Sequence, residues 1–189
     1  MAIERHPILR ALARARVPIL VVAATYVLAV AVGILMVHGG NGFALSYRDR
    51  IVARAHASDP ARLALERGEP MKTALDDFGR NLLIGAVPTS LAGLSIIGPF
   101  PIAAFRGWVG GIVSVDWAHE SRLKKRREAL YYLLTLALQL IPYSLTGGAG
   151  VLLGLSLFRR RPYDQRPRWI GISREAVLDV LRVYLMLTH

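Results

Sequence analysis

Three neighbouring polar residues, Asp116, His119 and Glu120, are the clearest group in this sequence that could do chemistry. Carboxylate and imidazole groups at this spacing lie on adjacent turns of a helix, where they could ligate a metal ion or transfer protons. They also follow an apolar run and stand beside Arg122 and Lys124. Solvation or ion pairing is the ordinary fate of charged side chains at such a place, and a metal site is the weaker alternative.

Three further polar residues, Asn81, Thr135 and Gln139, lie in apolar surroundings. Thr135 and Gln139 fall inside a run of thirty residues without a formal charge, Ala129–Phe158, and Asn81 opens a second run of this kind. Amides and hydroxyls in apolar segments tend to hydrogen-bond across helices. We therefore interpret these side chains as structural links between helices, with a substrate path as the alternative.

Motifs of the common enzyme classes are missing from the sequence. It contains no GxxxxGK phosphate loop, no GxSxG elbow, no HExxH helix and no dinucleotide-binding fingerprint in a suitable context. It also contains no cysteine, which excludes disulfides and thiolate catalysis. We expect a protein without catalytic residues or a cofactor.

The composition indicates a membrane protein. Of 189 residues 53% are hydrophobic, and the net charge of +11 is concentrated in short runs that flank apolar segments. Such runs attract anionic lipid head groups, so we do not expect nucleic-acid binding. The runs predicted to contact lipid comprise Lys124, Lys125, Arg126, Arg127, Arg159, Arg160 and Arg161.

The N-terminal apolar run, residues 17–37, predicts a first membrane span. It follows Arg10, Arg14 and Arg16, which place the N-terminus inside. A signal peptide shares the basic start, but its apolar region is only about 7 to 15 residues long. Residues 43–80 are nearly balanced in charge and predict an extramembrane and interfacial segment.

Residues 81–115 predict a broken membrane segment, because Pro88 and the run Gly98–Pro101 interrupt it. If it crosses twice, the basic run Arg122–Arg127 lies outside, against the usual charge bias. We therefore prefer one net crossing, made by a half-helix and a tilted span. This arrangement keeps every basic cluster inside.

Residues 129–158 predict a short helical hairpin. A straight helix of that length would be about 45 Å long, against a hydrocarbon core of about 30 Å. Pro142 and the run Gly147–Gly150 supply a place to turn. Residues 174–189 predict an amphipathic helix that lies at the interface or docks on a partner, with a short final span as the alternative.

The glycines of the apolar segments have the small-xxx-small spacing that allows helices to approach closely. We expect them to pack helices within the chain, with contact to a second subunit as the alternative. The predicted positions are Gly107, Gly111, Gly147, Gly148, Gly150 and Gly154.

From Thr73 to Phe158 the chain resembles the stage II sporulation protein M family. The residues that carry the resemblance are Phe78, Asn81, Gly98, Gly107, Gly111, His119, Leu153, Gly154 and the run Thr146–Gly150. The resemblance implies a small bacterial or archaeal multi-span protein without catalytic activity. The family also shows a His and a Glu one turn apart, but Thr135 and Gln139 stand at those places here. We therefore expect no role in this chain that depends on the charged pair of the family.

These observations predict an all-α polytopic membrane protein of the bacterial cytoplasmic membrane. We expect a single membrane domain, residues 1–189. It would act as a subunit or scaffold that organises other integral membrane proteins, and it could also associate with further copies of itself. A transporter or channel component, with its path at the broken helices, is the alternative. A lipid-modifying enzyme is a third possibility and would need Asp116, His119 and Glu120 to converge on one pocket.

Overall fold

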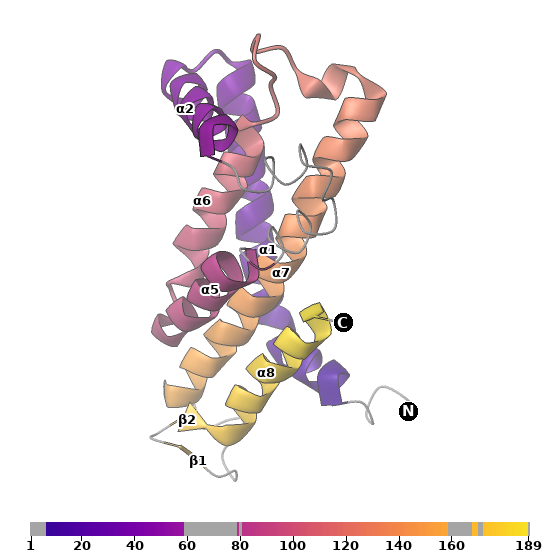
Figure 1. Ribbon diagram of the computed structural model, residues 1–189. Helices are drawn as coiled ribbons and strands as arrows, with labels where there is room; N and C mark the ends of the chain where they lie inside the picture. The colour runs from indigo at the N-terminus through magenta and orange to yellow at the C-terminus, as the bar shows by residue number, and fades with distance from the viewer. Residues whose placement is uncertain (1–6, 59–78, 80, 159–167, 170–171, 189) are drawn as a thin grey trace.

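The computed structural model describes residues 7–58, 79, 81–158, 168–169 and 172–188. The fold is all-α (Figure 1), and a two-residue strand pair, β1 (Arg168–Trp169) and β2 (Ile172–Ser173), precedes the last helix. The helices and helical turns are α1 (Pro7–His38), α2 (Gly42–Ser58), the π-helical turn η1 (Asn81–Ala86), α5 (Val87–Ala92), the 3₁₀ turn η2 (Gly93–Ser95), α6 (Pro99–Ile112), the 3₁₀ turn η3 (Arg122–Lys124), α7 (Arg126–Phe158) and α8 (Arg174–Thr188).

Two of these helices, α1 and α7, are long and apolar enough to cross a membrane. The predicted first span lies within α1, which keeps a regular helix through Pro18. One side of α1 is uncovered, with Leu20, Leu28 and Leu35 all more than 60% exposed. An apolar helix with this much exposed surface requires lipid or another protein around it.

The core lies where α1, α6 and α7 meet. Tyr26, Val30 and Leu136 are buried there with Ala103 and Tyr132. Gly107 and Gly111 of α6 contact the backbone of α1 at Tyr26 and Val30, so these two helices run in the same direction. Helix α7 runs the opposite way, because its glycines contact the N-terminal half of α1.

The predicted hairpin at residues 129–158 is wrong, because α7 is one continuous helix of 33 residues. Pro142 lacks the N–H that would donate to Leu138 O, yet α7 continues through it. Ser144 Oγ and Thr146 Oγ1 donate to other carbonyls of the same helix, Leu140 O at 2.6 Å and Pro142 O at 2.7 Å. The run Gly147–Gly150 is buried against neighbouring helices. These glycines therefore serve close packing instead of a turn.

The predicted break in residues 81–115 is confirmed. The chain passes through η1, α5 and η2, reverses at Ile96, whose φ is +66°, and returns as α6. Gly85 lies against Tyr143 and Gly93 against Gly150, so this segment runs parallel to α7 and antiparallel to α6. Residues 81–95, which we call the re-entrant segment because the chain turns back at their end, pair with the longer α6, as Figure 1 shows.

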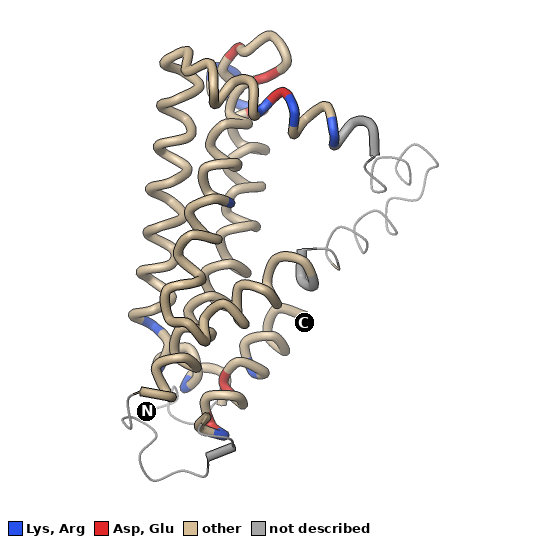
Figure 2. Tube along the Cα trace, turned by 90° about the vertical axis from the view of Figure 1, so that its left-hand side faces the viewer, with Lys and Arg blue, Asp and Glu red and all other residues tan. Residues whose placement is uncertain are grey.

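The prediction that every basic cluster lies on one side is wrong for Lys124–Arg127. His38, at the end of α1, lies 2.8 Å from Ser121 through Nε2 and Oγ. Arg14 lies 24 residues earlier on the same helix, about 36 Å away along its axis. Charged positions accordingly gather at both ends of the bundle in Figure 2. The reason is the continuity of α7, whose first residue, Arg126, and last residue, Phe158, lie at opposite ends of the bundle.

Parts of the predicted segments lie outside the described residues. These parts are residues 59–78 and 80 of the extramembrane segment and the basic run Arg159–Arg161. Helix α2, which begins the predicted extramembrane segment, packs across the end of α1 and α6, where Ala44 is buried with Val37 and Val115.

Candidate functional site

Arg106 is the only charged residue in the run Asn81–Val115. It lies on α6 and is half-buried, with its guanidinium carbon 5.7 Å from the centre of the Tyr143 ring on α7. None of the carboxylates in the described residues forms an ion pair with it. If the bundle spans a bilayer, a cation at its centre costs about 3 kcal/mol, and a cation–π contact recovers about 1 to 2 kcal/mol. The ring therefore offsets only part of the cost.

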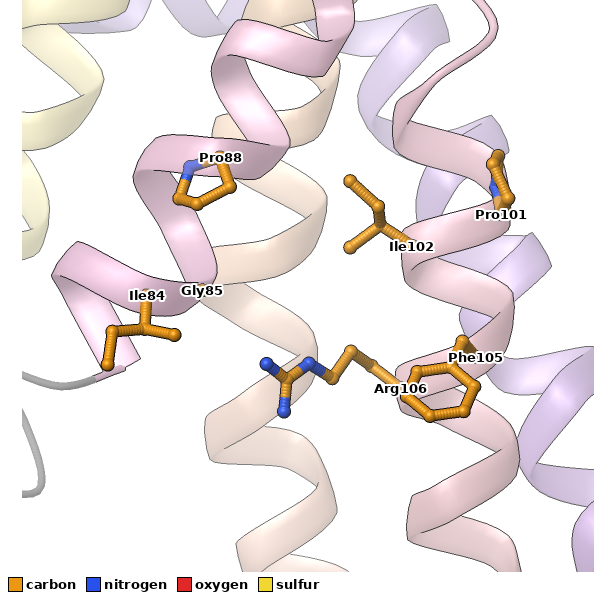
Figure 3. Close-up of a pocket in the computed structure, with 7 residues that line it drawn as sticks. All are labelled: Ile84, Gly85, Pro88, Pro101, Ile102, Phe105 and Arg106. Atoms are coloured by element: carbon orange, nitrogen blue, oxygen red, sulfur yellow. The ribbon is translucent and has the colours of Figure 1, made fainter.

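A groove of about 380 Å³ opens beside Arg106, between the re-entrant segment and α6 (Figure 3). Among the described residues Arg106 is its one charged lining residue, and the other lining residues described are apolar: Ile84, Gly85, Pro88, Pro101, Ile102 and Phe105. The reversal at residues 96–98 separates α5 from α6, and the position that a side chain of Gly85 would occupy faces Tyr143 of α7. The groove thus joins an apolar wall to one fixed positive charge.

The groove lies at mid-height of the bundle. Gly107, next to Arg106, contacts the backbone of Tyr26 on α1. Tyr26 is about 14 Å from Val17 and about 16 Å from Val37 along the helix axis, so it is near the centre of the apolar run. Arg106 is therefore as far from the two polar ends as the bundle allows.

A second apolar hollow, of about 340 Å³, lies on the other side of Phe105. Its lining combines Ala29 and Val32 of α1 with Ala104, Phe105 and Trp108 of α6. Phe105 therefore lines both hollows. The exposed apolar surface of α6 continues from the groove beside Arg106, past Phe105, to the side that faces α1.

The predicted polar link at Gln139 is present. Tyr26 donates its hydroxyl hydrogen to Gln139 Oε1 at 3.2 Å, which joins α1 to α7. Thr135 differs, because its hydroxyl bonds to Tyr131 O of the same helix at 2.9 Å and remains exposed. Asn81 begins η1, but its side chain lies outside the described residues.

The predicted packing glycines contact other helices of the same chain. A side chain on Gly107 or Gly111 would collide with the backbone of α1. On α7, Gly148 lies against Ile19, while Gly150 and Gly154 lie against Ser90 and Gly93 of the re-entrant segment. Gly147 is less tight and touches Thr89, Val22 and Pro99. These contacts fix one wall of the groove.

The structure does not bring Asp116, His119 and Glu120 together as metal ligands. Asp116 Oδ1 instead accepts the backbone N–H groups of Ala118 and Glu120, both at 2.9 Å. The Glu120 N–H bond is the main reason that the pKa of Asp116 is lowered. His119 turns to Asp49, with 3.1 Å between Nε2 and the carboxylate oxygens. Within the described part of the chain, no three His, Asp or Glu side chains form a metal-binding group.

Arg48 on α2 is fully buried at this end and was not predicted. It donates to Asp49 Oδ1 at 2.9 Å and to Val115 O at 3.2 Å, and it stacks over Trp117 at 5.0 Å. The Arg48 hydrogen bond, helped by His119, lowers the pKa of Asp49. This network attaches α2 to the loop after α6.

At the opposite end, α8 packs on α1 and α7 of its own chain. Asp179 is 2% exposed, and its Oδ2 accepts Arg14 Nε at 2.7 Å. Glu175 and Arg182 complete a cluster of two carboxylates and two guanidiniums. The amphipathic helix predicted at residues 174–189 is present, but it packs with Asp179 buried while the apolar Leu181 and Leu185 are more than half exposed.

Arg106 was not predicted as a site residue. The signal that could have identified it is its isolation, since one charge in 35 otherwise uncharged residues is costly unless it is used. No protein-family model, curated protein or solved structure matches this chain.

Proposed function

We propose that this chain is a non-enzymatic integral membrane subunit that organises a larger complex in a bacterial cytoplasmic membrane. The observation that carries the proposal is the contrast between a closed interior and an uncovered exterior. Inside, glycines bring the helices to backbone contact, and Gln139 and Ser90 are hydrogen-bonded within the bundle. Outside, a full face of α1 and the groove beside Arg106 are open.

The resemblance to the stage II sporulation protein M family supports the same proposal, since it implies a multi-span protein without catalytic activity. The N-terminus is proposed to lie inside, with Arg10, Arg14 and Arg16 near the cytoplasmic head groups. The proposed lipid contacts of Lys124–Arg127 then fall on the opposite face. There Arg127 stacks over Tyr131 at 5.7 Å, and Lys125 Nζ lies 3.2 Å from Glu128 Oε1.

The test is purification of the tagged full-length chain from its native membrane in a mild detergent. We expect one or more integral membrane proteins to co-purify in fixed proportion. The variant with Asp116, His119 and Glu120 all changed to alanine serves as a control, because it should retain these partners. A particle that contains only this chain would contradict the proposal.

One observation favours the alternative of a transporter component. Discontinuous helices near the middle of a membrane often form substrate sites, and Arg106 lies beside such a helix. A purified particle of this chain alone, with a bound small anion that is lost in Arg106→Gln, would support transport instead.

A further inference from the structure

Arg106 requires an anionic partner that the described residues do not provide. Its guanidinium meets only the Tyr143 ring there, and the groove around it is apolar. Charged groups within spanning segments are almost always paired. The question is therefore which anion reaches this depth.

The depth of Arg106 within a bilayer would limit the kinds of anion that can reach it. If α1 spans the bilayer, Arg106 is near the centre of a hydrocarbon core about 30 Å thick, so lipid head groups lie about 15 Å away on either side. Lipid phosphates rarely reach that level. A carboxylate carried on a transmembrane helix can lie at any depth, including this one.

The shape of the groove suits a helix. Ile84 and Phe105 are 62% and 49% exposed at its rim. Between them, Gly85, Pro88 and Pro101 present small or compact surfaces that allow close approach of another backbone. The other side of the re-entrant segment packs on α7, where Gly93 and Gly150 are in backbone contact.

A second copy of this chain does not fit the requirement. The apolar runs Val17–Val37, Asn81–Val115 and Ala129–Phe158 contain no Asp or Glu. Two copies would bring together two arginines at this depth and no carboxylate. The occupant must be a different protein.

We propose that the groove between η1–α5 and α6 binds a transmembrane helix of another protein, whose Asp or Glu near its midpoint pairs with Arg106. This inference rests on the proposed subunit function and names the chemistry of the partner. Arg106 would then determine which helix binds, because a helix without the acid leaves a buried charge unpaired.

The experiment places a photo-reactive residue at Ile84 in the full-length chain and irradiates native membranes. A second photo-reactive site at Leu28, on the uncovered face of α1, is the control. We expect a cross-link from Ile84 to a membrane protein, reduced about tenfold or more in Arg106→Gln and kept in Arg106→Lys. The Leu28 cross-links should not change.

A charge swap completes the test. The cross-linked helix should contain a central Asp or Glu, and its replacement by Lys should abolish the cross-link. Arg106→Asp combined with that replacement should restore it. Failure of the swap to restore a cross-link that both single changes abolish would overturn the proposal.

Other outcomes would also overturn it. These are a cross-link to lipid alone, a cross-link to residues 59–80 of the same chain, and a protein cross-link that persists in Arg106→Gln. The last result would leave the subunit function standing, since partners would still co-purify. Absence of any co-purifying protein with the wild-type chain would instead reject the subunit function itself.

Discussion

Two arginines, Arg14 and Arg106, lie on helices of the same bundle in opposite circumstances. Arg14 meets the buried carboxylate of Asp179 and also Glu175. Arg106 lies at mid-height with an aromatic ring and an open groove. The first charge is neutralised within the fold and serves stability. The second has no carboxylate partner among the described residues, and the proposed partner site is based on this observation.

The largest expected effect is at the neutralised site. Asp179→Asn leaves Arg14 and Arg182 without their buried carboxylate, and breaking such a pair costs about 3 kcal/mol. The apparent melting temperature of the detergent-solubilised chain should fall by several degrees. It can be followed by size-exclusion chromatography after heating.

The control for that change is Glu128→Gln, which breaks the exposed Lys125–Glu128 pair. Exposed pairs contribute about 0.5 kcal/mol, so this variant should melt like the wild type. If the two variants melted at the same temperature, the buried cluster around Asp179 would contribute no more to stability than an exposed ion pair does.

The second prediction concerns the wall of the groove that packs on α7. Gly150→Ala adds a methyl group against the backbone of Ser90, and overpacking of this kind costs about 2 kcal/mol. Gly42→Ala adds the same group where nothing lies within 4 Å. Thermal stability should fall for the first variant only. A stable Gly150→Ala protein would show that the wall moves easily.

The third prediction concerns Arg106 itself. Arg106→Leu removes an unpaired cation, so the stability of the isolated chain should stay constant or rise by about 1 kcal/mol. The same melting assay measures it, and Asp179→Asn provides the contrast. A clear loss of stability would mean that the contact with Tyr143 is structural and that the comparison fails.

The smallest effect is expected at the α2 end. The pKa of Asp49 is lowered from its ordinary value of 3.8, chiefly by Arg48, so its stabilising contribution is present above that value and is lost as the pH falls below it. Because Asp49 is 43% exposed, we expect about 0.5 kcal/mol or less.

Trp117, which stacks on Arg48, provides a signal for that change. Its fluorescence should shift between about pH 4 and pH 2, and Asp49→Asn should abolish this shift. A transition of the same size in the variant would assign the signal to another carboxylate.

Some features were predictable because they depend on nearby residues. The break just before α6, at residues 96–98, was predictable from Gly98 and the two prolines that follow it, because proline lacks a backbone donor and glycine is a poor helix former. The link through Gln139 follows from an amide in an apolar run. Pro142 shows the limit of such reasoning, because α7 stays helical through it, with the run Gly147–Gly150 packed closely against neighbouring helices.

The sequence by itself determined that this protein is all-α, that residues 17–37 form an apolar helix long enough for a membrane, and that one apolar segment is broken. These properties follow from side-chain polarity and local backbone chemistry. Only the tertiary structure decided that α7 is continuous, that Asp179 is buried against Arg14, and that Arg106 faces a groove. Each of these depends on contacts between residues far apart in the chain. The free energies of such contacts exceed the conformational preferences of a single segment, so no segment read alone predicts them.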